Sequence, residues 1–141
     1  MNTALKSIFL GLTLLSTTAF AFSPSQVPTS LDASIPSIRE SIAANLADGN
    51  IGVRTSTIQL VMELKDTYPD RSFDFAIIPL MNVLKSDEVP ELRMQAACAL
   101  NSYDSELARF AVSRRALYDS NDRVAKLCNA ITREWSTHSA D

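Results

Sequence analysis

The sequence predicts an all-α protein in which one helical unit is repeated along the chain. Apolar residues recur at intervals of three and four, the period of an α-helix, and no segment shows the alternation of a half-buried strand. Three stretches share one pattern, an acidic turn residue followed by a helix with apolar residues at the same relative positions. We therefore expect one supersecondary unit in about three copies that stack to bury their apolar faces.

The acidic turn residues of the three copies are Asp48, Asp87 and Asp119. The apolar stripes that follow them are Val53, Thr57, Leu60 and Leu64, then Leu92, Ala96, Ala99 and Tyr103, and then Val124, Cys128, Ile131 and Trp135. The copies are 39 residues apart (Val53 to Leu92) and 32 residues apart (Leu92 to Val124), so we expect the connecting helices or loops to differ in length. Trp135 is expected to cover the open end of the stack.

The first 21 residues have the layout of a cleavable signal peptide. Lys6 supplies the basic region, an apolar run begins at Ile8, and Ala19, Phe20 and Ala21 form an A-x-A cleavage site. The apolar run is shorter than the roughly 20 residues that a membrane span needs. We therefore predict cleavage after Ala21, export to the periplasm or the exterior, and no stable membrane insertion of the mature chain.

Residues 22–33 hold two prolines and several hydroxyl residues without periodicity, which predicts a flexible leader. The repeat domain is expected over residues 34–135. Its first helix carries the stripe Ile38, Ile42 and Leu46.

Five further helices complete three helical hairpins, and a disordered tail is expected over residues 136–141. These helices are predicted over residues 52–67, 72–85, 90–103, 105–118 and 122–135. Pro79 lies inside the first helix of the second hairpin, where the loss of a backbone hydrogen bond predicts a kink. The apolar side of the first helix of the third hairpin is expected to comprise Leu107, Phe110, Ala111 and Leu117.

The segment from Ala76 to Leu100 resembles a HEAT repeat. It has a first helix with an internal proline, an acidic turn, an apolar residue followed by arginine, and an Ala-rich second helix. The resemblance covers roughly residues 34–135 and implies a short right-handed α-solenoid of about three helix-turn-helix repeats. In that family the turn aspartate and the arginine after it pair between neighbouring repeats as a ladder, and the resemblance carries this role onto Asp48, Arg54, Asp87 and Arg93. Ala125 stands where the third arginine would be, so the ladder is expected to end there.

The charge of the chain argues against a nucleic-acid partner. The 141 residues carry a formal net charge of −3, and removal of residues 1–21 takes away only Lys6 among the charged side chains, leaving −4. Nucleic-acid binding needs a basic face that releases counterions. We therefore expect no nucleic-acid partner, and the stacked repeat with its mixed face predicts a protein or peptide partner instead.

Residues able to carry chemistry are few. His138, the only histidine, follows the last predicted helix, where nothing positions it as a base. The carboxylates near residues 119–122 do not match a calcium loop, because the twelfth position after Asp119 inclusive is Ala130 instead of glutamate. After the signal peptide only Gly49 and Gly52 remain, too few for a phosphate loop. We predict no catalytic residue, no metal ligand and no cofactor.

Cys98 and Cys128 lie on the second helices of adjacent copies. In the repeat register they differ by two positions, about 200° around a helix, as residues that face each other across parallel helices should. An exported chain meets an oxidising compartment. Two alternatives follow: a disulfide worth roughly 3 to 4 kcal/mol for a loop of about 30 residues, or two small buried thiols.

Opposite the core stripe, the second helices carry a mixed set of side chains that the resemblance places on a concave face. This candidate binding face comprises Thr55, Gln59, Met62, Met94, Asn101, Lys126 and Arg133. The methionines would make adaptable contacts, whereas the alternative is an ordinary solvated surface. We predict a non-enzymatic adaptor or scaffold; the alternatives are a structural subunit of an envelope complex and a HEAT-like enzyme or cofactor-handling protein.

Overall fold

The computed structural model describes residues 31–138, which form six α-helices, one 3-10 helix and no strand. The elements in chain order are α1 (Leu31–Leu46), α2 (Ile51–Thr67), η1 (Asp74–Ala76), α3 (Ile77–Ser86), α4 (Pro90–Asn101), α5 (Glu106–Tyr118) and α6 (Asp122–His138). The predicted all-α class is therefore confirmed. The predicted signal peptide and most of the predicted leader lie outside the described residues. Within the described range no helix is long and apolar enough to cross a membrane.

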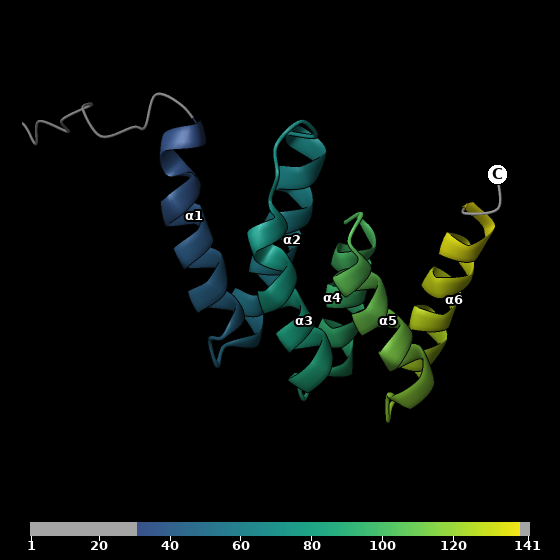
Figure 1. Cartoon of the computed structure of the whole chain (residues 1–141). Coiled ribbons are helices and arrows are strands. Elements are labelled where there is room, and N and C mark those ends of the chain that lie inside the picture. Colours follow the sequence, from purple (N-terminus) through teal and green to yellow (C-terminus); the bar gives the residue numbers. More distant parts are fainter. Residues whose placement is uncertain (1–30, 139–141) are drawn as a thin grey trace, which may run out of the picture.

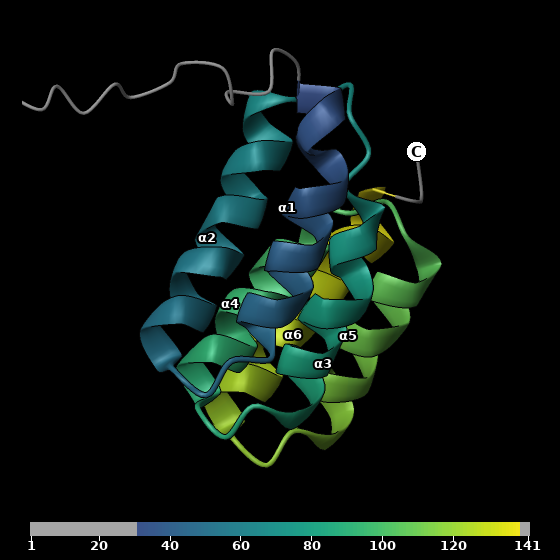
Figure 2. The same cartoon turned by 90° about the vertical axis from the view of Figure 1, so that its left-hand side faces the viewer.

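The helices form three hairpins that lie side by side (Figure 1). Each odd-numbered helix packs against the even-numbered helix that follows it. Between hairpins, α1 contacts α3 and α3 contacts α5, while α2 contacts α4 and α4 contacts α6. The result is two layers, α1, α3 and α5 in one and α2, α4 and α6 in the other (Figure 2).

The three acidic turns share one local structure. The carboxylate of each turn aspartate accepts a hydrogen bond from the backbone amide two residues later, at 2.6 Å for Asp48, 2.9 Å for Asp87 and 2.9 Å for Asp119. Asn50 and Asn121 then cap α2 and α6, since the side-chain oxygen of each accepts hydrogen bonds from the amides of the second and third helical residues. Aspartate suits this position because its short side chain closes a turn on its own backbone.

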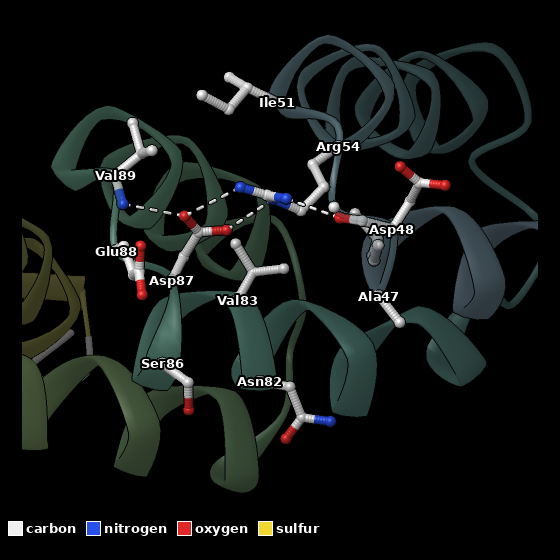
Figure 3. Close-up of a pocket in the computed structure, with 12 residues that line it drawn as sticks. Ala47, Asp48, Ile51, Arg54, Asn82, Val83, Ser86, Asp87, Glu88 and Val89 are labelled. Atoms are coloured by element: carbon white, nitrogen blue, oxygen red, sulfur yellow. Dashed lines mark hydrogen bonds and ion pairs between the residues drawn. The ribbon is translucent and has the colours of Figure 1, made fainter.

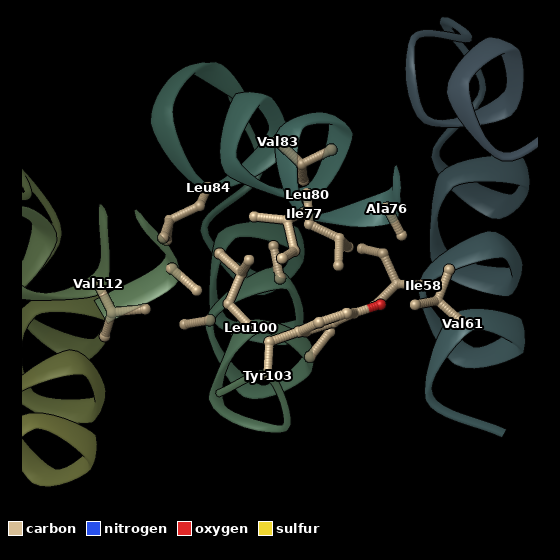
Figure 4. Close-up of a cluster of buried hydrophobic side chains, with 14 of the residues drawn as sticks. Ile58, Val61, Ala76, Ile77, Leu80, Val83, Leu84, Leu100, Tyr103 and Val112 are labelled. Carbon is tan, nitrogen blue, oxygen red and sulfur yellow. The ribbon is translucent and has the colours of Figure 1, made fainter. Parts of the chain in front are cut away.

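The core lies between the two layers, with α4 at its centre (Figure 4). All four residues of the predicted α4 stripe are buried, as are the first three residues of the α6 stripe. Trp135, the last residue of that stripe, is partly buried against the core. These two stripes are therefore confirmed.

The predicted stripe of α2 is wrong at Leu60. This side chain is 44% exposed, and Ile58 and Val61 are buried in its place. In the described structure α2 packs on α1 and α4 and has no hairpin on its other side. A side chain that points toward that open end stays uncovered.

The predicted apolar side of α5 is also wrong at three of its four residues, whereas Ala111 is partly buried against the core as expected. Leu107 is 45% exposed, Phe110 63% and Leu117 70%. The buried face of α5 instead carries Ala108, Val112 and Ala116, four residues apart. Small side chains at this spacing let α5 lie close against its neighbours, which leaves the large apolar residues outside.

Three smaller expectations change in the structure. Pro79 is the third residue of α3, in the first turn, where backbone amides have no partner within the helix. Pro79 therefore removes no hydrogen bond within α3, and the reason for the predicted kink does not apply. Helix α1 begins at Leu31, within the predicted leader, and α6 continues to His138, within the predicted disordered tail.

Candidate functional site

An open groove of about 520 Å³ crosses the layer formed by α2, α4 and α6. All three hairpins contribute to it. Its lining residues are Ile58, Gln59 and Met62 of α2, Glu91, Met94, Gln95 and Cys98 of α4, and Arg123 and Leu127 of α6.

Helical spacing brings these side chains to one surface. The four lining residues of α4 occupy positions i, i+3, i+4 and i+7, which lie along one face of a helix. Ile58 is fully buried beneath the surface, whereas Met62 is 37% exposed. The groove thus has an apolar base with flexible methionines beside it, and methionine adapts its shape to a partner more readily than branched side chains do.

Two polar features stand in this apolar setting. The Arg123 guanidinium is 3.0 Å from the Glu91 carboxylate, an exposed ion pair that joins α6 to α4. The side-chain oxygen of Gln95 is buried and accepts no hydrogen bond from any part of the described chain. A buried acceptor without a donor costs free energy, and this oxygen meets a ligand N–H only if the Gln95 side chain turns into the groove.

The groove contains three members of the predicted binding face, Gln59, Met62 and Met94. The other four, Thr55, Asn101, Lys126 and Arg133, do not line it. Sequence reasoning missed the two ionic residues Glu91 and Arg123, the buried acceptor of Gln95, and Ile58 and Leu127. The spacing of Glu91, Met94, Gln95 and Cys98 along one helical face was the signal that could have found those on α4.

The two cysteines are free thiols in the structure. Cys128 is buried in the core, but Cys98 is exposed in the groove, so the alternative of two buried thiols is wrong for Cys98. Burial raises the pKa of the Cys98 thiol. Burial and then the charges of Asp119 and Cys98 raise the pKa of Cys128 to about 11. Both are protonated at neutral pH, and a protonated thiol is a weak nucleophile.

A ladder of two arginine–aspartate pairs joins the turns of successive hairpins, and Figure 3 shows the first of them, Arg54 with Asp87. Arg54 Nε is 2.8 Å from the carboxylate of Asp87 in the next hairpin, and Arg54 Nη1 donates to the backbone carbonyl of Asp48 at 2.6 Å. Each arginine thus fastens the turn before its own helix and pairs with the turn of the following hairpin.

The second rung repeats this geometry. Arg93 donates to both carboxylate oxygens of Asp119, at 2.8 and 3.1 Å, and to the backbone carbonyl of Asp87 at 2.7 Å. The side chain of Asp119 is 1% exposed. Asp48, expected in the ladder, contributes only its carbonyl because no hairpin precedes it among the described residues. Asp119, which the prediction left out, closes the second rung.

The hollow of about 500 Å³ beside the first rung is lined by these turns. Arg54 and Asp87 already bind each other there, and the Val89 amide donates to Asp87 (Figure 3). Since Arg54 and Asp87 satisfy each other, we read this hollow as part of the scaffold. Residues 31–137 contain no group of three or more histidine, cysteine or carboxylate side chains placed to hold a metal ion.

Comparison with protein-family models, with curated proteins and with solved structures found no match to this chain.

Proposed function

We propose that this chain is an exported, non-enzymatic helical-repeat protein that binds a peptide segment of another protein in the groove across α2, α4 and α6. The open groove, in which Met62, Met94 and Leu127 from the three hairpins lie beside one another, carries this proposal. A peptide supplies apolar side chains for this lining and backbone N–H donors, one of which the unpaired Gln95 oxygen accepts once that side chain turns into the groove. Such a protein would act as an adaptor or scaffold.

The same arrangement supports a short right-handed solenoid of HEAT-like repeats. Three hairpins follow one another in two layers, and the two arginine–aspartate rungs join successive hairpins at equivalent positions. Repeat proteins of this kind present extended surfaces to their partners. Export to the periplasm or the exterior rests on the basic, apolar and A-x-A pattern of residues 1–21.

The methionines allow a direct test by NMR with methyl-labelled methionine. Met62 and Met94 line the groove, while Met81 lies on the other layer and serves as the internal control. Peptides are first selected from a random library on the mature protein at high salt, which weakens purely electrostatic binding. We expect the methyl signals of Met62 and Met94 to shift and that of Met81 to stay. Selected peptides that leave both groove signals unchanged would rule out this site.

A variant pair tests the role of Gln95. Gln95→Met keeps the length of the side chain but removes the acceptor, so affinity for the selected peptides should fall by about tenfold, the loss expected for one buried hydrogen bond. Lys126→Met makes a similar change outside the groove and should leave affinity unchanged. Equal effects of the two substitutions would contradict a specific contact with Gln95.

A second candidate is a structural subunit that packs end-on against another protein. Leu60 is 44% exposed and lines a shallow hollow with Ile38 and Ile42 at the α1–α2 end. If this end is an interface, Leu60→Ser should abolish co-sedimentation with the partner while leaving peptide binding in the groove intact. Co-sedimentation that survives Leu60→Ser would exclude the end-on contact.

A further inference from the structure

A second hollow of about 390 Å³ lies between α3 and α5, on the layer opposite the groove. Its lining combines apolar and aromatic side chains (Met81, Phe110 and Tyr118 among them) with three cations, Lys85, Arg114 and Arg115. No carboxylate is among the residues that line it. In a chain with a net charge of −3, this is a local excess of positive charge.

The aromatic side chains of this hollow are not needed by the core. Phe110 is 63% exposed and Tyr118 65% exposed. The close packing of α5 is made by the small residues on its other face. Leu107 and Leu117 of the same helix are exposed as well, so α5 presents several large apolar residues on its solvent side. Contiguous exposed apolar residues rimmed by charge are typical of interaction sites.

Two of the three cations are available to a ligand. Arg115 donates to the backbone carbonyl of Lys85 at 2.6 Å and lies 3.7 Å from the Asp119 carboxylate, so it is held by the scaffold. Lys85 and Arg114 have no ion-pair partner within residues 31–137. The Arg114 guanidinium lies 4.7 Å from the centroid of the Tyr118 ring, a cation–π contact that orients it at the edge of the hollow.

We propose that this hollow binds an acidic peptide segment, with carboxylates on Lys85 and Arg114 and an apolar side chain held between Phe110 and Tyr118. Charge complementarity selects an acidic partner, because the lining offers cations and no competing carboxylate. The site is a hollow and not a flat surface, which favours an inserted side chain over a lipid bilayer. This surface is separate from the groove and does not depend on the function proposed for it.

The test uses a fluorescein-labelled peptide of glutamate and leucine and a matched peptide of glutamine and leucine. Fluorescence anisotropy with the mature chain should show that the glutamate peptide binds and that added salt weakens it, while the glutamine peptide binds at least tenfold less tightly. Met81 should shift in the methyl NMR spectrum, and Met62 and Met94 should not. No binding of the glutamate peptide at about 1 mM would overturn the proposal.

Two exposed substitutions locate the site without disturbing the core. Phe110→Ala and Arg114→Gln should each weaken binding of the glutamate peptide by about tenfold, as loss of a central aromatic or arginine contact does. Met62→Ser, in the groove, should have no effect. If neither substitution changes the affinity for the glutamate peptide, the peptide does not bind in this hollow. A second contrary result is also possible. If vesicles of anionic lipid bind the protein, if Phe110→Ala and Arg114→Gln weaken that binding, and if the glutamate peptide does not bind, the ligand of the hollow is a membrane.

Discussion

Asp119 shows how much one carboxylate contributes to this structure. Its side chain pairs with Arg93 of the preceding hairpin, closes its own turn through the Asn121 amide, and lies near Arg115. Burial alone would raise the pKa of Asp119. The hydrogen bonds from Arg93 and Asn121 and the charges of Arg93 and Arg115 outweigh it and lower that pKa below its ordinary value. The charged form is therefore the one that the fold stabilises.

Loss of this carboxylate should be costly. Asp119→Asn leaves the buried guanidinium of Arg93 without its counter-charge, and we expect the free energy of unfolding to fall by about 3 kcal/mol. Asp104 is the matched control, because it pairs with Arg109 while 94% exposed. Asp104→Asn should cost less than about 0.5 kcal/mol. Urea denaturation of the two variants measures both values, and equal losses would contradict a dominant role for the buried rung.

The same pair predicts a pH dependence. Because the pKa of Asp119 is lower in the folded chain than in the unfolded chain, its stabilising contribution is complete above the unfolded value of about 3.9. That contribution is lost as the pH falls through the lower folded value. The free energy of unfolding should therefore decrease more steeply with acid in the wild type than in Asp119→Asn. Parallel curves for the two proteins would show that Asp119 does not titrate in this way.

The cysteines give a prediction at the same scale. Cys98 is exposed in the groove and Cys128 is buried, so a thiol reagent should modify one cysteine in the native protein and both after unfolding. The raised pKa of Cys98 should make its modification slow at neutral pH and faster as the pH increases. Mass spectrometry counts the labels. If the chain is unfolded without a reductant and neither cysteine is labelled, Cys98 and Cys128 form the disulfide that was one of the two alternatives predicted from the sequence.

At the scale of elements, Tyr103 ties the end of α4 to the segment that precedes η1. Its hydroxyl donates to the Phe73 carbonyl at 3.3 Å in a buried setting, and Lys65 Nζ lies 4.1 Å from its ring centroid. Tyr103→Phe keeps the ring and the cation–π contact and removes one of the two donors to the Phe73 carbonyl, which retains the hydrogen bond from the Ala76 amide at 2.9 Å. We expect a loss of about 1 kcal/mol in thermal or chemical denaturation. A loss above about 3 kcal/mol would mean that the ring packing changes too.

The sequence predicted the buried faces of α4 and α6 better than those of α2 and α5. The stripes of α4 and α6 are buried as expected because their large apolar residues face the neighbouring helices, α2, α3, α5 and α6 for α4 and α4 and α5 for α6. For α5 the periodicity of large residues pointed to the wrong face. Alanines at positions 108 and 116 form the interface there, and a small residue carries little weight in a count of apolar side chains. At Leu60 the pattern failed because the end of the stack has nothing to cover it.

At the scale of the whole molecule, the repeated motif explains why the contacts between hairpins could be predicted from the sequence. Equivalent turns place Arg54 and Arg93 opposite the next aspartate, so a repeated motif predicts a contact between distant residues. The groove was only partly foreseen, because its lining depends on how far neighbouring hairpins rotate against each other. The cationic hollow was not foreseen, since Lys85 and Arg114 are brought together only by the packing of α3 on α5.

The most direct measurement is site-specific photo-crosslinking of the mature protein in the cells that make it. A photoreactive residue at Gln59, in the groove, is compared with one at Lys126, outside it. We predict that the Gln59 probe captures a defined partner protein, that a peptide selected on the groove competes with it, and that Gln95→Met reduces it. Capture of the same partner with equal yield from Lys126, unaffected by the peptide, would contradict binding in the groove.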